Sequence, residues 1–214
     1  MPRKPAASKI RRIGPPAPNR LLLRVTLRHT NPPIWREISV SDDFSLFQLH
    51  RVIQLVFGWL DYHLFHFEIG SRRFERVHPE AVGEDAGAAH LRDFKLKRGK
   101  SFVYIYDMGD YWEHDLLVTE IAPIPPNDMP SWIASLIGGA RAAPPEDVGG
   151  PPGYEAALAA LRRGANADKE LVAWIGKDFN PELFDRRAVD HALVLASAWD
   201  ALGSDTHHPS NRGG

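Results

Sequence analysis

The chain of 214 residues contains no cysteine, and this absence excludes several kinds of chemistry. The protein cannot form disulfides, thiolate zinc sites or iron–sulfur clusters, and it has no cysteine nucleophile and no CxxC redox pair. Any metal that it binds must be held by His, Asp or Glu side chains.

The sequence also lacks long apolar runs and an excess of charge of one sign. No segment approaches the ~18 apolar residues of a membrane span, and the first thirty residues lack the apolar core of a secretory signal. The formal net charge of -1 excludes a uniformly basic nucleic-acid coat protein. We therefore expect a cytoplasmic protein with no membrane contact.

Several common catalytic motifs are absent from the sequence as well. It contains no GxGxxG, no GxSxG nucleophile elbow and no HExxH. Gly99-Lys100-Ser101 resembles the end of a phosphate-binding P-loop, but Phe94 stands where that motif requires its first glycine. The usual nucleotide, esterase and zinc-protease chemistries therefore have no support.

Composition divides the chain into three parts. Residues 1–20 contain six Lys or Arg, five Pro and no acid, which predicts a disordered basic arm. Such an arm can make weak contacts with nucleic-acid phosphates, although arms of this kind are more often solubilising tails. Residues 203–214 are polar and are predicted to form a disordered tail. Residues 21–202 are predicted to form a single domain, because their number suits one hydrophobic core.

Hydrophobic periodicity within residues 21–202 predicts strands first and helices last. The alternation of apolar and polar residues from Leu21 is that of a half-buried strand, and residues 46–57 have the spacing of an amphipathic helix that Gly58 ends. Further strands are predicted at 34–40, 61–69, 101–106 and 111–121, and further helices at 132–137, 154–163, 169–175 and 186–202. This order indicates an α+β fold, with a mostly antiparallel sheet, one early helix packed on it and C-terminal helices.

Three polar residues in the predicted strands bear on a possible site. Arg36 falls on the inward side of its strand, where it could clamp an anionic ligand, reach the rim of the sheet or pair with a structural carboxylate. His63 and His66 are expected to point to opposite faces of the strand at 61–69, so they are not predicted to share a metal.

The densest group of acidic residues lies on the predicted hairpin. Four carboxylates and the imidazole of His114 fall between Asp107 and Asp115, with Asp110 in the turn. This set is sufficient to bind a cation or to support general acid–base chemistry. The same residues also suit an ordinary turn, in which Asp side chains bond the backbone, Gly109 supplies a positive φ and His114 is a buried core residue.

The register of this hairpin decides which of its side chains meet. If Asp107 pairs with Tyr111 across the turn, Trp112 faces Tyr106 and His114 faces Tyr104, so His114 lies in an aromatic wall. Glu113 and Asp115 then lie on the opposite face. A slip of one residue would reverse this arrangement.

A second candidate segment is the Pro- and Gly-rich stretch from Gly138 to Tyr154. Its four prolines stiffen the loop and its five glycines allow close backbone approach, so Glu146 and Asp147 are presented on a shaped segment. Such a loop could line a site. It could equally be a structural clasp whose carboxylates cap backbone amides ahead of the helix at Tyr154.

The chain carries five motifs in order. These are P-x-I-W-R at 32–36, L-x-x-L-H-x-x-I-Q at 46–54, G-W-x-x-x-H-L at 58–64, Y-D-x-G-D-x-W-x-H at 106–114 and P-P-E-D-x-G-G-x-x-G-Y at 144–154. With these motifs the sequence resembles the plasmid pRiA4b ORF-3-like family over residues ~20 to ~200. The resemblance implies an α+β fold and occurrence on plasmids, in insertion elements and in bacterial chromosomes, without an established activity. Many members carry a cysteine shortly before P-P-E-D, and its absence here implies that no thiol is essential in this chain.

The leading interpretation is that the hairpin and the loop form one acidic, aromatic-lined pocket. Its predicted ligand-binding, catalytic and wall residues are Arg36, Asp107, Asp110, Trp112, His114, Glu146, Asp147 and Tyr154. As an enzyme it would perform hydrolysis, with His114 as a metal ligand or a general base and the carboxylates as metal ligands or as groups that orient it; the cofactor stays open, and a divalent metal is one that this set could hold. His114, Asp107 and Glu146 are then the catalytic candidates, and Asp107, Asp110 and His114 the candidate metal ligands.

Two other interpretations belong to different classes. One is a nucleic-acid accessory protein of mobile elements, in which the basic arm contacts phosphates; the mildly acidic remainder of the chain weakens it unless positive charge gathers on one face. The other is an interaction scaffold without catalysis, in which the motifs serve folding alone.

Overall fold

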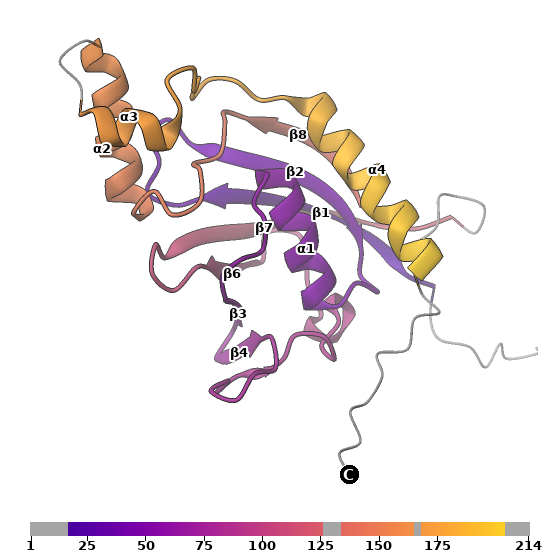
Figure 1. Cartoon of the computed structure of the whole chain (residues 1–214). Helices are drawn as coiled ribbons and strands as arrows, with labels where there is room; N and C mark the ends of the chain where they lie inside the picture. Colours follow the sequence, from indigo (N-terminus) through magenta and orange to yellow (C-terminus); the bar gives the residue numbers. More distant parts are fainter. Residues whose placement is uncertain (1–16, 126–133, 165–167, 204–214) are drawn as a thin grey trace, which may run out of the picture.

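The computed structural model describes residues 17–125, 134–164 and 168–203, with side chains up to residue 198 (Figure 1). The strands are β1 (Asn19–Leu27), β2 (Ile34–Ser41), β3 (Phe65–Ile69), β4 (Arg72–Glu75), β5 (Glu84–Asp85), β6 (Ser101–Tyr106), β7 (Trp112–Pro123) and β8 (Ser135–Ala140). The helices are α1 (Leu46–Phe57), the 3-10 helix η1 (Leu91–Phe94), α2 (Gly150–Arg163), α3 (Lys169–Ile175) and α4 (Arg186–Gly203).

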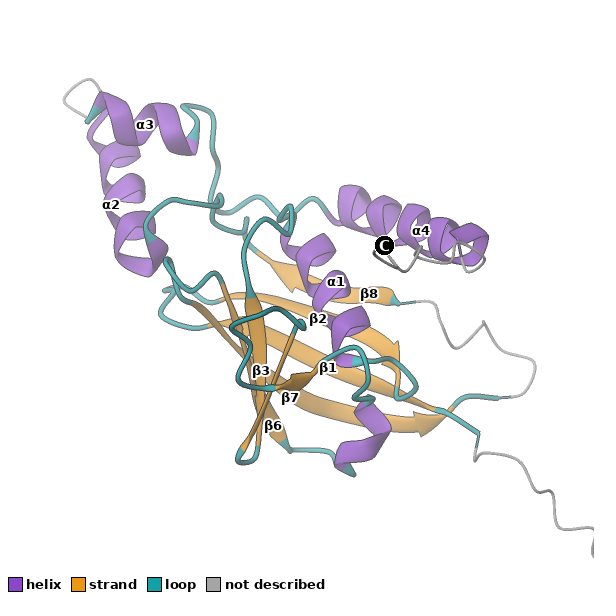
Figure 2. Cartoon of the chain, turned by 60° about the horizontal axis from the view of Figure 1, so that its bottom comes forward, coloured by secondary structure: helices purple, strands orange, loops and turns teal. Residues whose placement is uncertain are grey.

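All eight strands belong to one sheet, in the order β5-β4-β3-β6-β7-β1-β2-β8. Every neighbouring pair is antiparallel except β4 and β5. Helix α1 lies over the sheet, α4 runs past β8, and α2 and α3 stand together at one end (Figures 1 and 2). The predicted α+β fold with a mostly antiparallel sheet is confirmed.

The core lies between the sheet and α1. In β1 alternate residues are fully buried, as the sequence pattern requires. Helix α1 has the predicted bounds because a capping box starts it: Gln48 donates its backbone N–H to Ser45 Oγ, and Ser45 donates its own to Gln48 Oε1. Gly58 ends it in the left-handed region, at φ 74°.

The β6–β7 hairpin has the first of the two registers considered above. Tyr106 pairs with Trp112 and Tyr104 with His114. The turn itself differs from the prediction, because the residues with positive φ are Asp107 (58°) and Tyr111 (57°) rather than Gly109. A short polar side chain such as Asp tolerates this conformation better than most.

The helix predicted at 132–137 is wrong over its described part. Residues 135–140 form β8, which pairs antiparallel with β2, and residues 126–133 lie outside the described ones. A short apolar run does not distinguish the two periodicities, and the free edge of β2 offers it a ladder of hydrogen bonds.

Other boundaries differ by a few residues. β1 begins at Asn19, inside the predicted arm, and α2 begins at Gly150, because Pro151 and Pro152 fit the first helical turn. The strand predicted at 61–69 begins only at Phe65, so residues 58–64 form a loop between α1 and β3. Among the described residues, no helix combines the length and the apolar character needed to cross a membrane.

Candidate functional site

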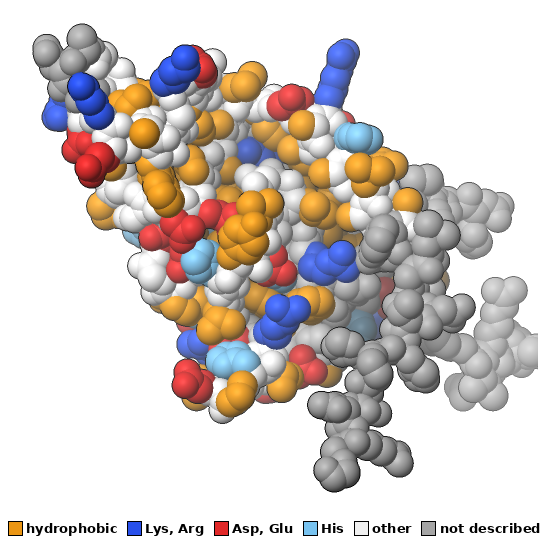
Figure 3. All heavy atoms as spheres, in the orientation of Figure 1, with side chains coloured by type: hydrophobic (Ala, Val, Ile, Leu, Met, Phe, Trp, Pro, Cys, Tyr) orange, Lys and Arg blue, Asp and Glu red, His pale blue; other side chains and the backbone are white. Residues whose placement is uncertain are grey.

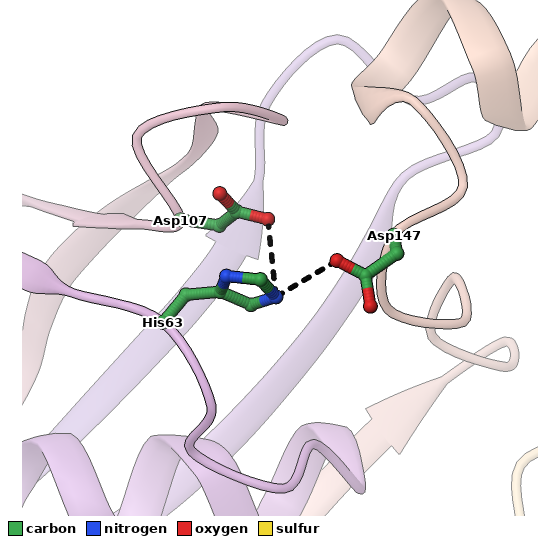
Figure 4. A group of neighbouring side chains, drawn as sticks. All are labelled: His63, Asp107 and Asp147. Carbon is green, nitrogen blue, oxygen red and sulfur yellow. Dashed lines mark ion pairs between the residues drawn. The ribbon is translucent and has the colours of Figure 1, made fainter.

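Three segments far apart in sequence meet at the end of the sheet beneath α2. They are the loop at 58–64 after α1, the turn at 107–111 between β6 and β7, and the loop at 141–149 that leads into α2. Each contributes one side chain to a cluster of His63, Asp107 and Asp147, which we call the triad (Figure 4). The first of these side chains was not among the predicted site residues.

The triad is held close around the imidazole of His63. Its Nε2 atom lies 2.8 Å from Asp147 Oδ1 and 3.6 Å from Asp107 Oδ2 (Figure 4). All three potential ligand atoms lie within 4.8 Å of one another. The Nε2 atom is shielded from solvent, yet it makes no well-aligned hydrogen bond within the described part of the chain.

The backbone of the β6–β7 turn orients Asp107. Its N–H donates to Leu64 O (2.9 Å) and its carbonyl accepts the N–H of Tyr111 (2.7 Å). Its Oδ1 accepts the N–H of Gly109 (2.8 Å), which leaves Oδ2 facing His63. One oxygen of this buried carboxylate therefore serves the turn and the other serves the triad.

Tyr106 and Glu146 hold the loop that carries His63. The Tyr106 hydroxyl donates to Glu146 Oε1 (2.5 Å) and accepts the N–H groups of Tyr62 (3.1 Å) and His63 (3.4 Å). Leu60 donates its N–H to Glu146 Oε2 (2.9 Å). Burial and the Glu146 carboxylate raise the pKa of Tyr106, so its hydroxyl stays protonated as the donor.

The loop at 141–149 docks on the hairpin through two further contacts. Trp59 stacks on Tyr106 and donates its Nε1–H to Pro144 O (2.9 Å), and Asp110 Oδ2 accepts the N–H of Gly149 (3.1 Å). Gly150 has φ 64°, and a Cβ there would lie 2.3 Å from Asp110 O. Only glycine permits the loop to approach the hairpin so closely, and this approach brings Asp147 to the triad.

A buried polar network supports the loop at 58–64, which carries His63. His50 contacts Tyr104 Oη through Nδ1 and Asp61 Oδ1 through Nε2, both at 2.8 Å. Gln54 donates to the same hydroxyl (3.0 Å) and accepts the N–H of Asp61 (3.1 Å). Burial lowers the pKa of His50. These bonds fix residue 61, two positions before His63.

The structure does not bring His114 to the triad. Its ring is fully buried among Phe57, Trp59 and Tyr104, and Nδ1 lies 3.1 Å from Trp112 O. Burial lowers the pKa of His114 to about 3. The imidazole is therefore neutral at physiological pH and sits within the predicted aromatic wall.

Three other predicted site residues, Trp112, Tyr154 and Arg36, are buried. The ring of Tyr154 lies edge-on to Phe179. Arg36 lies under the sheet edge, where Nε donates to Val56 O (2.7 Å) and Nη1 to the carbonyls of Trp35 and Ala140. Desolvation lowers the pKa of Arg36 to about 10.

The two remaining acids of the hairpin lie on its opposite face, as the register predicted. Arg28 contacts Glu113 Oε1 at 3.1 Å and Asp115 Oδ1 at 2.6 Å. These carboxylates form an ion-pair network with Arg28, which directly follows β1, and do not contribute to the triad.

His63 could have been found from the sequence by another route. His63 lies in the motif G-W-x-x-x-H-L at 58–64. This motif is one of the five that also include those containing Asp107 and Asp147. We considered His63 only as a partner for His66, which is buried in β3. The prediction failed because the loop at 58–64 is not a strand, so the alternation rule did not apply to it.

Comparisons with known proteins agree with the fold. The chain matches the sequence profile of the plasmid pRiA4b ORF-3-like protein family over residues 19–188. It is 35% identical over 184 residues to the uncharacterized protein y4hQ of Sinorhizobium fredii, covering 83% of this chain and 92% of that protein. A crystal structure of a protein of unknown function from Methanosarcina mazei Go1, MM3350, is similar with a TM-score of 0.71 and 31% identity, covering 80% of this chain and 98% of that one.

Proposed function

This chain belongs to the plasmid pRiA4b ORF-3-like protein family, and from that premise we propose that its triad binds a divalent metal ion and uses it in a hydrolytic reaction. The observation that carries the proposal is the position of His63 Nε2. It is shielded from solvent, faces two carboxylates, and has no aligned hydrogen bond among the described residues. An imidazole nitrogen in such a position is a natural metal ligand.

The spacing of the ligand atoms supports this proposal. Metal–ligand bonds of about 2.1 Å place neighbouring ligand atoms ~3.4 Å apart in a tetrahedral site and ~3.0 Å apart in an octahedral one. The two distances from His63 Nε2, 2.8 and 3.6 Å, lie on either side of these values. The two carboxylate oxygens lie within 4.8 Å of each other, so an ion that contacts all three atoms would draw the two carboxylates around it.

The donor set narrows the class of metal. One imidazole nitrogen and two carboxylate oxygens suit divalent transition-metal cations such as Zn²⁺, Mn²⁺ or Fe²⁺. Ca²⁺ prefers six to eight oxygen ligands, so it fits this set poorly. Asp110 accepts the Gly149 N–H and His114 is buried in the aromatic wall, outside the cluster of potential ligand atoms, so the proposal assigns the places predicted for them to Asp147 and His63.

Three protein ligands would leave coordination positions for water and a substrate. Asp147 is 50% exposed at its side chain, so the ion would be reached from that side. A metal lowers the pKa of a bound water and can polarise a carbonyl or phosphoryl oxygen, which is the basis of metal-assisted hydrolysis. Glu146 and Tyr106 act here as positioning residues, because their bonds hold the loop of His63.

Exposed apolar side chains lie on the segments that carry the triad and on the neighbouring helix α3. Tyr62 is 72% exposed beside His63, Tyr111 is 48% exposed in the hairpin turn, and Trp174 of α3 is 58% exposed and donates to Glu146 O. Figure 3 shows acidic side chains, a histidine and hydrophobic side chains gathered below α2 and α3. This surrounding favours a small substrate with an apolar or planar part.

Metal binding by the full-length protein, freed of any affinity tag, tests the proposal. Isothermal titration with Zn²⁺ and Mn²⁺ should give one site in the wild type and at least a tenfold loss of affinity in Asp147→Asn and Asp107→Asn. Asp110→Asn is the matched control, because an amide oxygen there can still accept the Gly149 N–H. A wild type that binds neither metal, or three variants with equal affinity, would refute the metal site.

The scaffold alternative makes the opposite prediction. If the triad is only a clasp between the three loops, removing His63 lowers stability and no metal raises the melting temperature. A melting shift with metal that disappears in His63→Ala supports the proposed site instead.

An association of this gene with plasmids or insertion elements is a separate proposal, and the replicon that carries the gene tests it.

A further inference from the structure

We propose that the opposite end of β6 carries a second, independent site, a basic surface that binds the phosphate backbone of double-stranded nucleic acid. We call it the basic turn; it consists of Lys97, Arg98 and Lys100, with Lys95 beside them. All four side chains are exposed. The proposal does not rest on the metal site.

The cations of the basic turn are held close together by the backbone. Lys100 donates its N–H to Lys97 O at 2.9 Å, and Gly99 takes φ 84°, so residues 97–100 form a hydrogen-bonded β-turn. The Cα atoms of the first and last residues of such a turn lie within ~7 Å. Gly99 also donates to Val118 O at 2.8 Å, which anchors the turn to β7.

These cations lack acidic partners in the part of the chain that the structure describes. None of the four takes part in an ion pair with a carboxylate there; Lys100 Nζ approaches only the carbonyl of Phe94, at 3.5 Å. By contrast, the neighbouring Arg92 is paired with Asp43. Unpaired like charges on one short turn repel each other, and a polyanion would relieve that repulsion.

The start of β1 lies near the segment that leads to this turn. Asp42 donates its N–H to Asn19 O and Arg92 donates its N–H to Asp42 O, both at 2.8 Å, so the start of β1 lies beside the segment that leads from η1. Figure 2 shows η1, the short unlabelled helix at the lower edge, close to the strands of this end.

Charge is strongly divided between these segments and the rest of the chain. Residues 1–20 contain six Lys or Arg and no acid, and residues 92–100 contain five with one Asp, which gives a formal charge of +10. Because the whole chain carries -1, the remaining residues carry -11. The net charge thus conceals two basic segments, and positive charge of this kind attracts a polyanion.

The chemistry of the surface favours nucleic acid over a membrane. Membrane-binding surfaces combine Lys and Arg with exposed Trp, Phe or Leu that insert among the lipids. Here Phe94 packs edge-on against Phe74 at 5.1 Å, and Leu96 is half-buried beside Leu21 and Ile121. The apolar residues of the segment face inward, and its exposed charged side chains are four cations and Asp93.

Salt-dependent binding of the full-length protein to a labelled 30-base-pair duplex tests the proposal, in EDTA so that metal binding plays no part. The variant is Lys97→Gln/Arg98→Gln/Lys100→Gln. The control, with the same change of charge, is Lys169→Gln/Lys177→Gln/Arg187→Gln, which alters exposed residues near the other end. Melting curves establish that both variants fold.

We expect the wild type and the control to bind the duplex at 50 mM salt, and the basic-turn variant to bind at least tenfold more weakly. The slope of log K against log salt should fall in magnitude by two to three in that variant, because each lost phosphate contact removes about 0.9. Three results would overturn the proposal: no binding by the wild type at 25 mM salt, equal losses in both variants, or equally strong binding to vesicles containing phosphatidylserine.

Discussion

The two ends of β6 differ in how their charged residues are assembled. At one end, Asp107 meets His63 and Asp147, which are supplied by two other segments of the chain. At the other end, a single turn supplies three cations from neighbouring positions. With a rise of ~3.3 Å per residue, the two groups lie roughly 20 Å apart. The first group depends on the tertiary fold, whereas the second needs only a local turn and its anchor to β7.

This difference predicts unequal sensitivity to glycine substitutions at the two ends. Gly150→Ala should lower the free energy of unfolding by about 2–4 kcal/mol, because its Cβ would collide with Asp110 O and its φ is positive. Gly99→Ala should cost only about 1 kcal/mol, because it has a positive φ but no heavy atom within 4 Å. Chemical denaturation of both variants checks this, and equal losses would contradict it.

Acid should weaken the aromatic wall beneath the metal end more than the basic turn. The folded-state pKa of His114, about 3, lies below its unfolded value of about 6.5, so the unfolded chain takes up the proton first. The stability that this histidine contributes is complete above pH ~6.5 and is lost as the pH falls toward 3, at up to about 1.4 kcal/mol per pH unit.

Burial lowers the pKa values of His50 and His66 as well, so they add to the same trend. Unfolding titrations between pH 6.5 and 4 should therefore give a shallower slope in His114→Phe than in the wild type. An unchanged slope would mean that His114 does not titrate as its burial requires.

Removing the Tyr106 hydroxyl should separate positioning from ligation at the metal end. Tyr106→Phe leaves Glu146 Oε1 without its donor and frees the loop of His63, which should cost about 1–2 kcal/mol and weaken metal binding by at least tenfold. Tyr111→Phe, at a half-exposed residue five positions away, is the control. Equal metal affinity in the two variants would remove Tyr106 from its positioning role.

The smallest effect on stability is expected at the basic end. The triple glutamine variant of the basic turn should change the free energy of unfolding by less than about 0.5 kcal/mol, with any gain arising from reduced repulsion between the cations. A loss of more than 1 kcal/mol would show that these side chains serve the fold. Denaturation at two salt concentrations makes the comparison.

The sequence was sufficient for elements whose determinants are local. Helix α1 follows from its capping box and Gly58, and the β6–β7 hairpin follows from its aromatic and β-branched strands around a short turn, although its register was left open between two alternatives. The strand β8 was missed because its pairing with β2 is non-local. Within the candidate site, Asp107 and Asp147 were predicted to share one pocket, but their approach to His63 depends on contacts between three loops that periodicity does not encode.

The most direct test of the metal site is anomalous diffraction from crystals of the full-length protein soaked in Zn²⁺ or Mn²⁺. We predict one strong peak about 2.0–2.3 Å from His63 Nε2, Asp107 Oδ2 and Asp147 Oδ1, and no peak there in crystals of Asp147→Asn. A map in which these three side chains contact only each other, with no anomalous peak between them, would contradict the account.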